Sequence, residues 1–396
     1  MDQERRGKTF YHFYDLDHAA TSFNFILQLV SAEFARVETT DCDHTYTVFI
    51  PGRNNGFNPT DVYGVEVKQH RLLSILLPAL SLYKSNTSYC LLQTREEAQE
   101  LIEAAGPCKF PIGYELEPSS DCLELGTSVL NACLGYRPKS IRAPVRAVAL
   151  INQLVSRVCP GQKFITITAR SSAHLVQRNS SPATLTKIAQ YMQQHGYFVF
   201  FLPDYDVALQ VSDICIPGAY VAREVSLNLP LRSALYELAS LNIGDGGPTS
   251  LFYFNTRCNY IVNNFSWPDD TRDVQKVLRR EGLVNGKGIN YYNTFARWIW
   301  EFDDAAATID ACAEFIEYCQ GRGVDDAKKH TVSLDEVLET LSELLGLDAV
   351  NIIKSKYSNR QNGPLFINRE FTWDEKRNMK HVIKSAQLIN TDFNFM

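Results

Sequence analysis

The sequence of 396 residues lacks any apolar run of the roughly 18 residues that a membrane helix needs, and the longest run, 72–82, stops short. Residues 1–10 lack the apolar core of a secretory signal peptide. Positive charge is not in excess either, because 39 lysines and arginines face 45 aspartates and glutamates, a formal net charge of −6. We therefore expect no transmembrane segment and no nucleic-acid binding by bulk electrostatics.

The cysteines do not have the spacing of a disulfide framework or of a zinc site. Ten of them are scattered along the chain and no Cys-x-x-Cys pair occurs, so the pattern indicates neither a disulfide-stapled domain nor a zinc site. Four lie in or beside apolar runs, where free cysteine behaves as a small apolar residue: Cys90, Cys159, Cys215 and Cys258. A reducing, cytoplasmic location is the prediction.

What the sequence does contain is an alternation of strand-like and helix-like patterns in an ordinary globular composition, with 45% hydrophobic and 21% charged residues. The expected strands are 8–14, 45–50, 88–92, 164–169, 197–202, 241–243 and 259–262. The expected helices are 18–36, 70–83, 95–105, 182–195, 293–300 and 305–320. This order predicts an α/β fold with largely parallel sheets. The proline-rich segment 106–145 has few periodic runs, so we interpret it as the crossing between two domains.

The richest stretch runs from Leu231 to Asn264, and its centre is the glycine turn 244–250. Glycines let backbone N–H groups approach a ligand, and Pro248 suits the first turn of a following helix. Such a helix N-terminus attracts phosphate. The turn has neither the Gly-Lys-Ser/Thr of a P-loop nor the third glycine of a dinucleotide fingerprint, whose place Thr249 takes. The competing interpretation is an ordinary strand-to-helix turn.

Two arginines follow the expected strand 164–169. Arg170 ends it, and Arg178 with Asn179 opens the next helix after a polar loop. Arginine's fork suits a diphosphate, so the pair is a candidate for phosphate binding; two surface arginines are the alternative.

Acidic residues follow two other strands. Asp204 and Asp206 come after strand 197–202, and two hard carboxylates at this spacing suit Mg²⁺ or Mn²⁺. Asp15, Asp17 and His18 come after the first strand, where one of them could act as general base on an acceptor hydroxyl. A helix N-cap is the commoner use of aspartate at that position.

The second half resembles the nucleotide-sugar-binding half of GT-B glycosyltransferases, most nearly the heptosyltransferase type. The resemblance covers about residues 163–265 and rests on FITITAR…QRN, GYFVFFLPD and ALYELASLNIGDGGPTSLFYFN. In that family the last turn faces the phosphates of the donor. The resemblance therefore implies donor binding at Asp245, Gly246, Gly247, Pro248, Thr249 and Ser250. The chain departs from the family at Gly246, where serine is usual, and no clear lysine follows Arg170.

Together these features predict two Rossmann-like β/α domains of GT-B type, 1–145 for the acceptor and 146–325 for the nucleotide sugar, with a helical C-terminal appendage at 326–396. The resemblance implies transfer of a sugar from a nucleotide-sugar donor to a saccharide or glycoconjugate, as in polysaccharide biosynthesis, with no cofactor and no essential metal. Two alternatives stay open. One is a metal-dependent GT-A-type transferase that uses Asp204 and Asp206, and the other is a non-catalytic module that binds a nucleotide or sugar.

Overall fold

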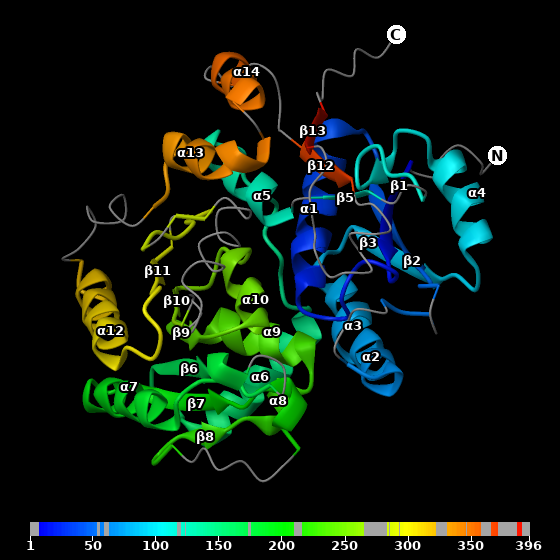
Figure 1. The fold of residues 1–396 in the computed structure, drawn as a ribbon. Coiled ribbons are helices and arrows are strands. Elements are labelled where there is room, and N and C mark those ends of the chain that lie inside the picture. Colours follow the sequence, from blue (N-terminus) through cyan, green and yellow to red (C-terminus); the bar gives the residue numbers. More distant parts are fainter. Residues whose placement is uncertain are drawn as a thin grey trace.

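The chain forms an α/β fold with two separate parallel sheets, seen side by side in Figure 1. The computed structural model describes residues 8–53, 56–58, 63–116, 120–122, 124–172, 176–209, 216–264, 283–284, 286–292, 294–321, 331–345, 347–357, 366–370 and 386–389. We call residues 8–116 the N-terminal half and residues 145–321 the C-terminal half. Among the described residues, no helix is both long and apolar enough to cross a membrane.

The N-terminal sheet has the order β3-β2-β1-β4, and every neighbouring pair is parallel. Its strands are β1 (Thr9–Asp15), β2 (His44–Ile50), β3 (Asn86–Leu91) and β4 (Lys109–Phe110). Its main helices are α1 (Asn24–Thr39), α2 (Val65–Arg71), α3 (Leu77–Ala79) and α4 (Arg95–Ala105). A π-helical stretch, Leu72–Leu76, joins α2 to α3. On one sheet face Phe13 and Val48 pack against Ile102 of α4. The other face carries Tyr14 and Phe49, which pack with Ile26 of α1.

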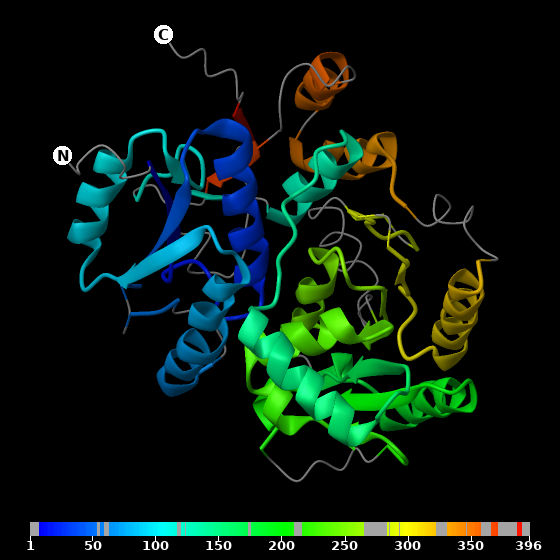
Figure 2. The same ribbon diagram turned by 180° about the vertical axis from the view of Figure 1, so that it is seen from behind.

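The C-terminal sheet has the order β11-β10-β9-β6-β7-β8 and is also parallel throughout. Its strands are β6 (Phe164–Thr168), β7 (Phe198–Leu202), β8 (Tyr220–Val221), β9 (Leu241–Gly244), β10 (Tyr260–Val262) and β11 (Ala296–Trp298). Its helices are α6 (Val145–Val158), α7 (Pro182–Gln194), α8 (Arg223–Ser226), α9 (Leu229–Leu238), α10 (Ser250–Tyr253) and α12 (Ala305–Cys319). The near face of this sheet in Figure 2 is crossed by α6. Ile165 and Ile167 point the other way and pack with residues of α7 and α12.

Helix starts follow the capping chemistry of the sequence. Thr94 Oγ1 accepts from Glu97 N at 3.2 Å in a complete capping box at α4. Ser181 caps α7, and Pro182 occupies its first turn. The sequence pattern Ser333-x-x-Glu336 predicts another capping box, and the structure confirms it, because Ser333 N donates to Glu336 Oε2 at 3.0 Å and Glu336 N to Ser333 Oγ at 3.4 Å. The same pattern at Thr372 and Glu375 predicts a further capping box, which lies outside the described residues.

Three expectations need correction. The predicted helix at 293–300 is wrong, because β11 lies there as a parallel edge strand on β10 and buries Trp298. The crossing segment contains a helix, α5 (Glu124–Cys133), whose Val129 and Leu130 are fully buried. The appendage is not purely helical: its described residues form the helices α13 (Leu334–Leu345) and α14 (Leu347–Tyr357) and then two strands.

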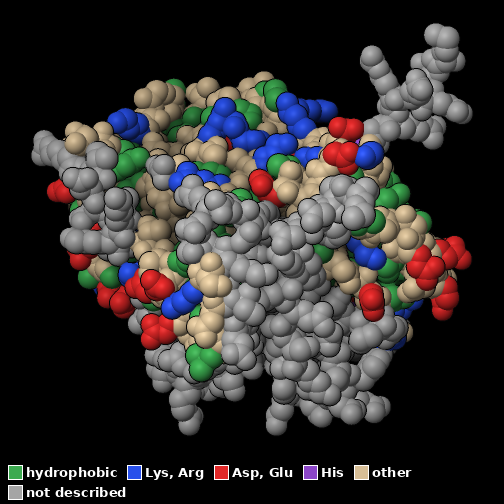
Figure 3. Space-filling model, turned by 90° about the horizontal axis from the view of Figure 1, so that it is seen from above, with side chains coloured by type: hydrophobic (Ala, Val, Ile, Leu, Met, Phe, Trp, Pro, Cys, Tyr) green, Lys and Arg blue, Asp and Glu red, His purple; other side chains and the backbone are tan. Residues whose placement is uncertain are grey.

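Beyond α14 the chain returns to strand. The strands β12 (Phe366–Glu370) and β13 (Ala386–Ile389) form an antiparallel sheet with β5 (Ser120–Cys122), in the order β13-β12-β5. Tertiary pairing with β5, far away in sequence, fixes these strands. Seen from above, the described surface of the molecule carries both basic and acidic side chains (Figure 3), in keeping with the mixed charge of the chain.

Candidate functional site

A cavity of about 320 Å³ opens between the two halves of the molecule. The C-terminal half contributes the residues that follow three adjacent strands: Arg170 after β6, Asp204 after β7 and Asp245 after β9. In open α/β sheets this carboxyl edge is where ligands bind. The N-terminal half contributes Ser22, Phe23, Asn24, Leu27, Tyr63 and Arg71. We call this cavity the cleft.

The glycine turn forms part of the cleft wall, with Gly246 at φ 78°. A Cβ on Gly246 would lie 3.3 Å from Arg170 Cδ, and one on Gly247 would lie 3.0 Å from Phe23 Cβ. The glycines therefore make room for two side chains of the cleft. The helix that follows, α10, is only four residues long. A helix this short has a weaker dipole than the sequence pattern indicated.

Arg170 and Arg178 both line the cleft, as do Asp245, Gly246, Gly247, Pro248, Thr249 and Ser250. Asn179 is not part of the lining but orients Arg170, whose Nη1 donates to Asn179 Oδ1 at 2.6 Å. The same oxygen accepts from Ser172 N at 2.9 Å. Arg178 is largely buried; burial lowers its pKa, and the nearby Arg170 charge adds to this while Asp245 opposes it. The structure thus brings together two arginines that the sequence placed eight positions apart.

Asp245 is the most unusual acid in the cleft. It is only 2% exposed, and burial raises its pKa to about 7 against the opposing effects of Arg178 and Asn264. Among the described residues, its Oδ2 accepts two hydrogen bonds, both long: from Ser180 Oγ at 3.5 Å and from Asn264 Nδ2 at 3.4 Å. A carboxyl with this pKa exchanges its proton near neutral pH, which is a property found often at functional sites.

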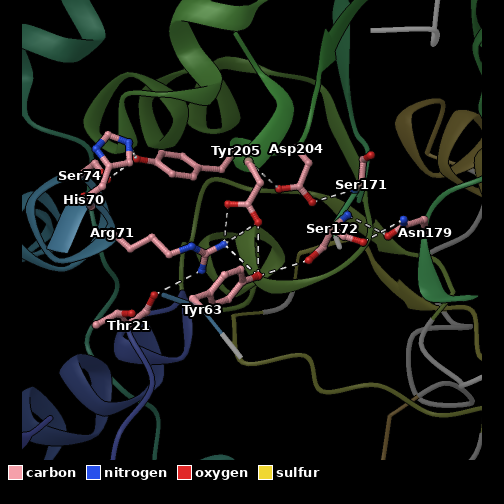
Figure 4. Close-up of polar contacts among 11 residues, drawn as sticks. Thr21, Tyr63, His70, Arg71, Ser74, Ser171, Ser172, Asn179, Asp204 and Tyr205 are labelled. Atoms are coloured by element: carbon pink, nitrogen blue, oxygen red, sulfur yellow. Dashed lines mark hydrogen bonds and ion pairs between the residues drawn. The ribbon is translucent and has the colours of Figure 1, made fainter. Parts of the chain in front are cut away.

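Asp204 and Asp206 are held inside a polar network that joins the halves (Figure 4). Arg71 Nη2 donates to both oxygens of Asp206, at 2.8 and 3.0 Å. The guanidinium also lies 4.3 Å above the Tyr63 ring, and Tyr63 OH donates to Asp206 Oδ2 at 3.3 Å. The described residues contain no group of three or more side chains placed to hold a metal ion.

The same network also includes contacts made by Asp204 and Tyr205. Asp204 Oδ2 accepts from Ser171 N at 2.8 Å, so this carboxylate braces the loop after β6. Tyr205 OH and His70 Nε2 lie 2.6 Å apart, and Tyr205 also contacts Ser74. Sequence reasoning missed Tyr63, Arg71 and Phe23. No local signal points to them, since each acquires its place only through contact with the opposite half.

Asp15, Asp17 and His18 are not among the residues that line the cleft. Asp15 and His18 line a separate cavity of about 10 Å³. Arg95 Nη1 and Nη2 bind the two oxygens of Asp15 at 2.8 and 3.0 Å, and Tyr114 OH donates at 2.8 Å. Burial works against the charge of Asp15, but these hydrogen bonds outweigh it and lower the pKa. Asp17 Oδ1 accepts from Arg53 N at 2.9 Å. The proposed base role of this trio stays a prediction from sequence.

No protein-family model and no curated protein matches the chain. Solved structures give a looser likeness. A glycosyl transferase family 9 protein from Veillonella parvula aligns with 85% of this chain and 97% of its own, at 10% identity and a TM-score of 0.42. The dodecameric glycosyltransferase TibC from enterotoxigenic E. coli aligns over 85% and 76%, at 14% identity and 0.36. The wall teichoic acid polymerase TagF aligns over 89% and 90%, at 11% identity and 0.31. Scores this low do not establish a shared family.

Proposed function

We propose that this chain is a GT-B-type glycosyltransferase that moves a sugar from a nucleotide-sugar donor to a hydroxyl of a saccharide or glycoconjugate, without an essential metal. The observation that carries the proposal is the meeting of Arg170, Arg178 and Asp245 at the carboxyl edge of one parallel sheet. Two fixed cations in a partly buried cleft suit a diphosphate, and they stabilise the charge that develops on it as it departs.

Asp245 fits this role in its neutral form. A carboxylate beside a diphosphate would repel it, but a carboxyl with a pKa of about 7 is easily protonated when an anion arrives. The protonated group donates a hydrogen bond. Binding of a donor is therefore expected to take up a proton near neutral pH.

The experiment is calorimetric titration with a panel of nucleotides and nucleotide sugars. Arg170→Ala and Arg178→Ala each remove one charge-assisted interaction, about 1.5–3 kcal/mol, which is about tenfold to a hundredfold in affinity. Arg146→Ala on the exposed side of α6 is the matched control and should bind as the native protein does. Native affinity in both cleft variants would contradict the proposal.

The two alternatives predict different results. Asp204 and Asp206 both line the cleft, so a metal-dependent transferase stays a candidate. In that case chelator abolishes turnover, added Mn²⁺ restores it, and Asp206→Ala removes the rescue. A metal-independent enzyme keeps its activity in chelator. A non-catalytic module would bind the nucleotide sugar but neither hydrolyse nor transfer it. The observation that favours such a module is that Asp15, a candidate base, lines a different cavity from the cleft.

A further inference from the structure

Arg232 on α9 is a fully buried arginine, with 0% of the residue exposed. Its Nη2 lies 3.5 Å from the carbonyl oxygen of Pro203, at the outer limit of a hydrogen bond. Its Nε and Nη1 have no hydrogen-bond partner among the residues that the structure describes. Buried charged groups are almost always paired, because leaving one unpaired is costly. An apolar side chain of similar size would fill the same space without that cost. Packing alone therefore does not explain why arginine stands here.

The guanidinium lies directly behind the cleft wall. Its Cζ is 5.7 Å from the centre of the Phe23 ring, and Phe23 lines the cleft. Arg232 is also close enough to Asp204, another lining residue, for its charge to oppose the burial that raises the pKa of that carboxyl. The Phe23 ring offers the cation a weak cation–π contact in place of an ion or hydrogen-bond partner.

Phe23 and Arg232 belong to different halves of the molecule. Phe23 precedes α1 in the N-terminal half and is 7% exposed, whereas Arg232 belongs to the C-terminal half. The absence of a side chain at Gly247 lets the ring lie close to the glycine turn, since a Cβ there would lie 3.0 Å from Phe23 Cβ, which is tighter than an ordinary contact. A small shift of one half, or a rotation of this ring, would uncover the guanidinium toward the cleft.

We infer that Arg232 is a covered anion-binding residue of the cleft, which binds a phosphate or diphosphate group of the ligand once Phe23 moves aside. The inference rests on the proposed use of the cleft by a phosphate-bearing ligand, but it concerns a residue beyond Arg170 and Arg178. It also gives the buried arginine a use: without an anion, the Phe23 ring covers a cation that has few hydrogen-bond partners, and this poorly satisfied charge favours the arrival of an anion. The bound anion then supplies the hydrogen-bond acceptors that Arg232 Nε and Nη1 lack among the described residues.

The test compares Arg232→Met with the native protein, using inorganic pyrophosphate as the probe in calorimetry and thermal unfolding. Methionine keeps the length of the side chain and removes its charge, so we expect a melting temperature equal to or higher than native without pyrophosphate. We expect pyrophosphate affinity to fall by about tenfold or more, the effect of one charge-assisted hydrogen bond. Arg146→Met, on the exposed side of α6, is the matched control and should change neither quantity.

A second variant approaches the same contact from the other half. Phe23→Ala removes the cover, so it should bind pyrophosphate several-fold more tightly than the native protein. The double variant Phe23→Ala with Arg232→Met should lose that gain. Phe23→Ala alone keeps the inference testable even if Arg232→Met does not fold, because its expected gain in pyrophosphate affinity needs only the native Arg232, and unchanged or weaker binding in this variant would contradict it.

Three other results would also overturn the inference. They are the absence of pyrophosphate binding to the native protein, native affinity in Arg232→Met, and a gain in Phe23→Ala that survives in the double variant. Failure of the proposed function looks different. If no nucleotide sugar binds, yet pyrophosphate binding depends on Arg232, the anion site stands and the glycosyltransferase proposal falls.

Discussion

Each half of the molecule places a buried aspartate at the carboxyl end of an inner strand of its sheet. Asp15 ends β1, which pairs with β2 and β4, and Asp245 directly follows β9, which pairs with β6 and β10. Both are almost fully buried, at 7% and 2% exposed, and both have arginine nearby. Asp15 has a two-pronged ion pair with Arg95 and a hydrogen bond from Tyr114. Asp245 has two long hydrogen bonds from the residues that the structure describes.

Because the two aspartates differ in how well they are paired, they suit different roles: Asp15 a structural one and Asp245 a chemical one. Arg95 and Tyr114 satisfy the charge of Asp15, so its pKa is lowered and the carboxylate stays ionised. Burial dominates at Asp245 and raises its pKa to about 7. A fully paired charge stabilises the fold and is poorly suited to exchange a proton. The incompletely paired one is poised to respond to a ligand. The same residue type at equivalent places in the two sheets thus serves different ends.

Removing Asp15 is expected to have the largest effect. Asp15→Ala leaves the half-buried Arg95 without its acid, and breaking a buried pair in this way costs about 3–5 kcal/mol of unfolding free energy. Urea denaturation at neutral pH measures it. Asp245→Asn is the matched variant in the other half and should be as stable as the native protein or more stable at pH 8. A loss below about 1 kcal/mol in Asp15→Ala would remove the contrast between the two sites.

The pH dependence of stability distinguishes the same two residues. Asp245 binds its proton more tightly when folded, with a pKa of about 7 against an ordinary value of 3.8. Between these values the folded state holds a proton that the unfolded chain has lost. The free energy of unfolding therefore falls as pH rises, by up to about 1.4 kcal/mol per pH unit from this group. Above pH 7 the Asp245 carboxyl is ionised in both the folded and the unfolded state, so the stabilisation from its bound proton is fully lost.

The contribution of Asp15 to the free energy of unfolding changes with pH in the opposite direction and over a lower pH range. Its folded pKa lies below 3.8, so its stabilisation is present above that value and is lost as pH falls through the folded pKa. Urea unfolding of the native protein and Asp245→Asn at pH 5, 6 and 7 isolates the Asp245 contribution. The difference between the two proteins should shift steadily in favour of the variant as pH rises. Parallel curves would mean that Asp245 does not titrate in this range.

The sequence predicts that Arg170, Arg178 and the glycine turn lie close together, because their positions follow a general rule of parallel sheets. Residues at the carboxyl ends of neighbouring parallel strands share one edge, so strand order alone brings them together. Arg71, Phe23 and Arg232 follow no such rule. Arg71 meets Asp206 across 135 positions of chain, and its place in a helix resembles that of any surface arginine. Only the docking of the two halves turns it toward the cleft.

The failed predictions have the same physical origin. Residues 293–300 are rich in aromatic and polar groups without a clear period, and the free edge of β10 decides that Ala296–Trp298 is a strand. The strand β12 depends on pairing with both β5 and β13. Both elements are determined by contacts between distant segments, whereas α4 and α7 were predicted within one residue because their caps lie in their own sequence.

The Arg71–Asp206 pair joins the halves whose aspartates we compare, and its coupling energy should be smaller than the stability lost in Asp15→Ala. The Arg71 side chain is 8% exposed and that of Asp206 is 21% exposed, so water compensates Asp206 better than Arg71 when its partner is removed. Asp206→Ala should therefore destabilise more than Arg71→Met does, although the latter also loses the Tyr63 contact. The double variant should lose less than the sum of the two, with a coupling energy on the order of 1–2 kcal/mol. Urea unfolding of the four proteins gives this value directly. A coupling near zero would mean that the two halves dock without help from this ion pair, so that Asp206 would be free to act on a ligand.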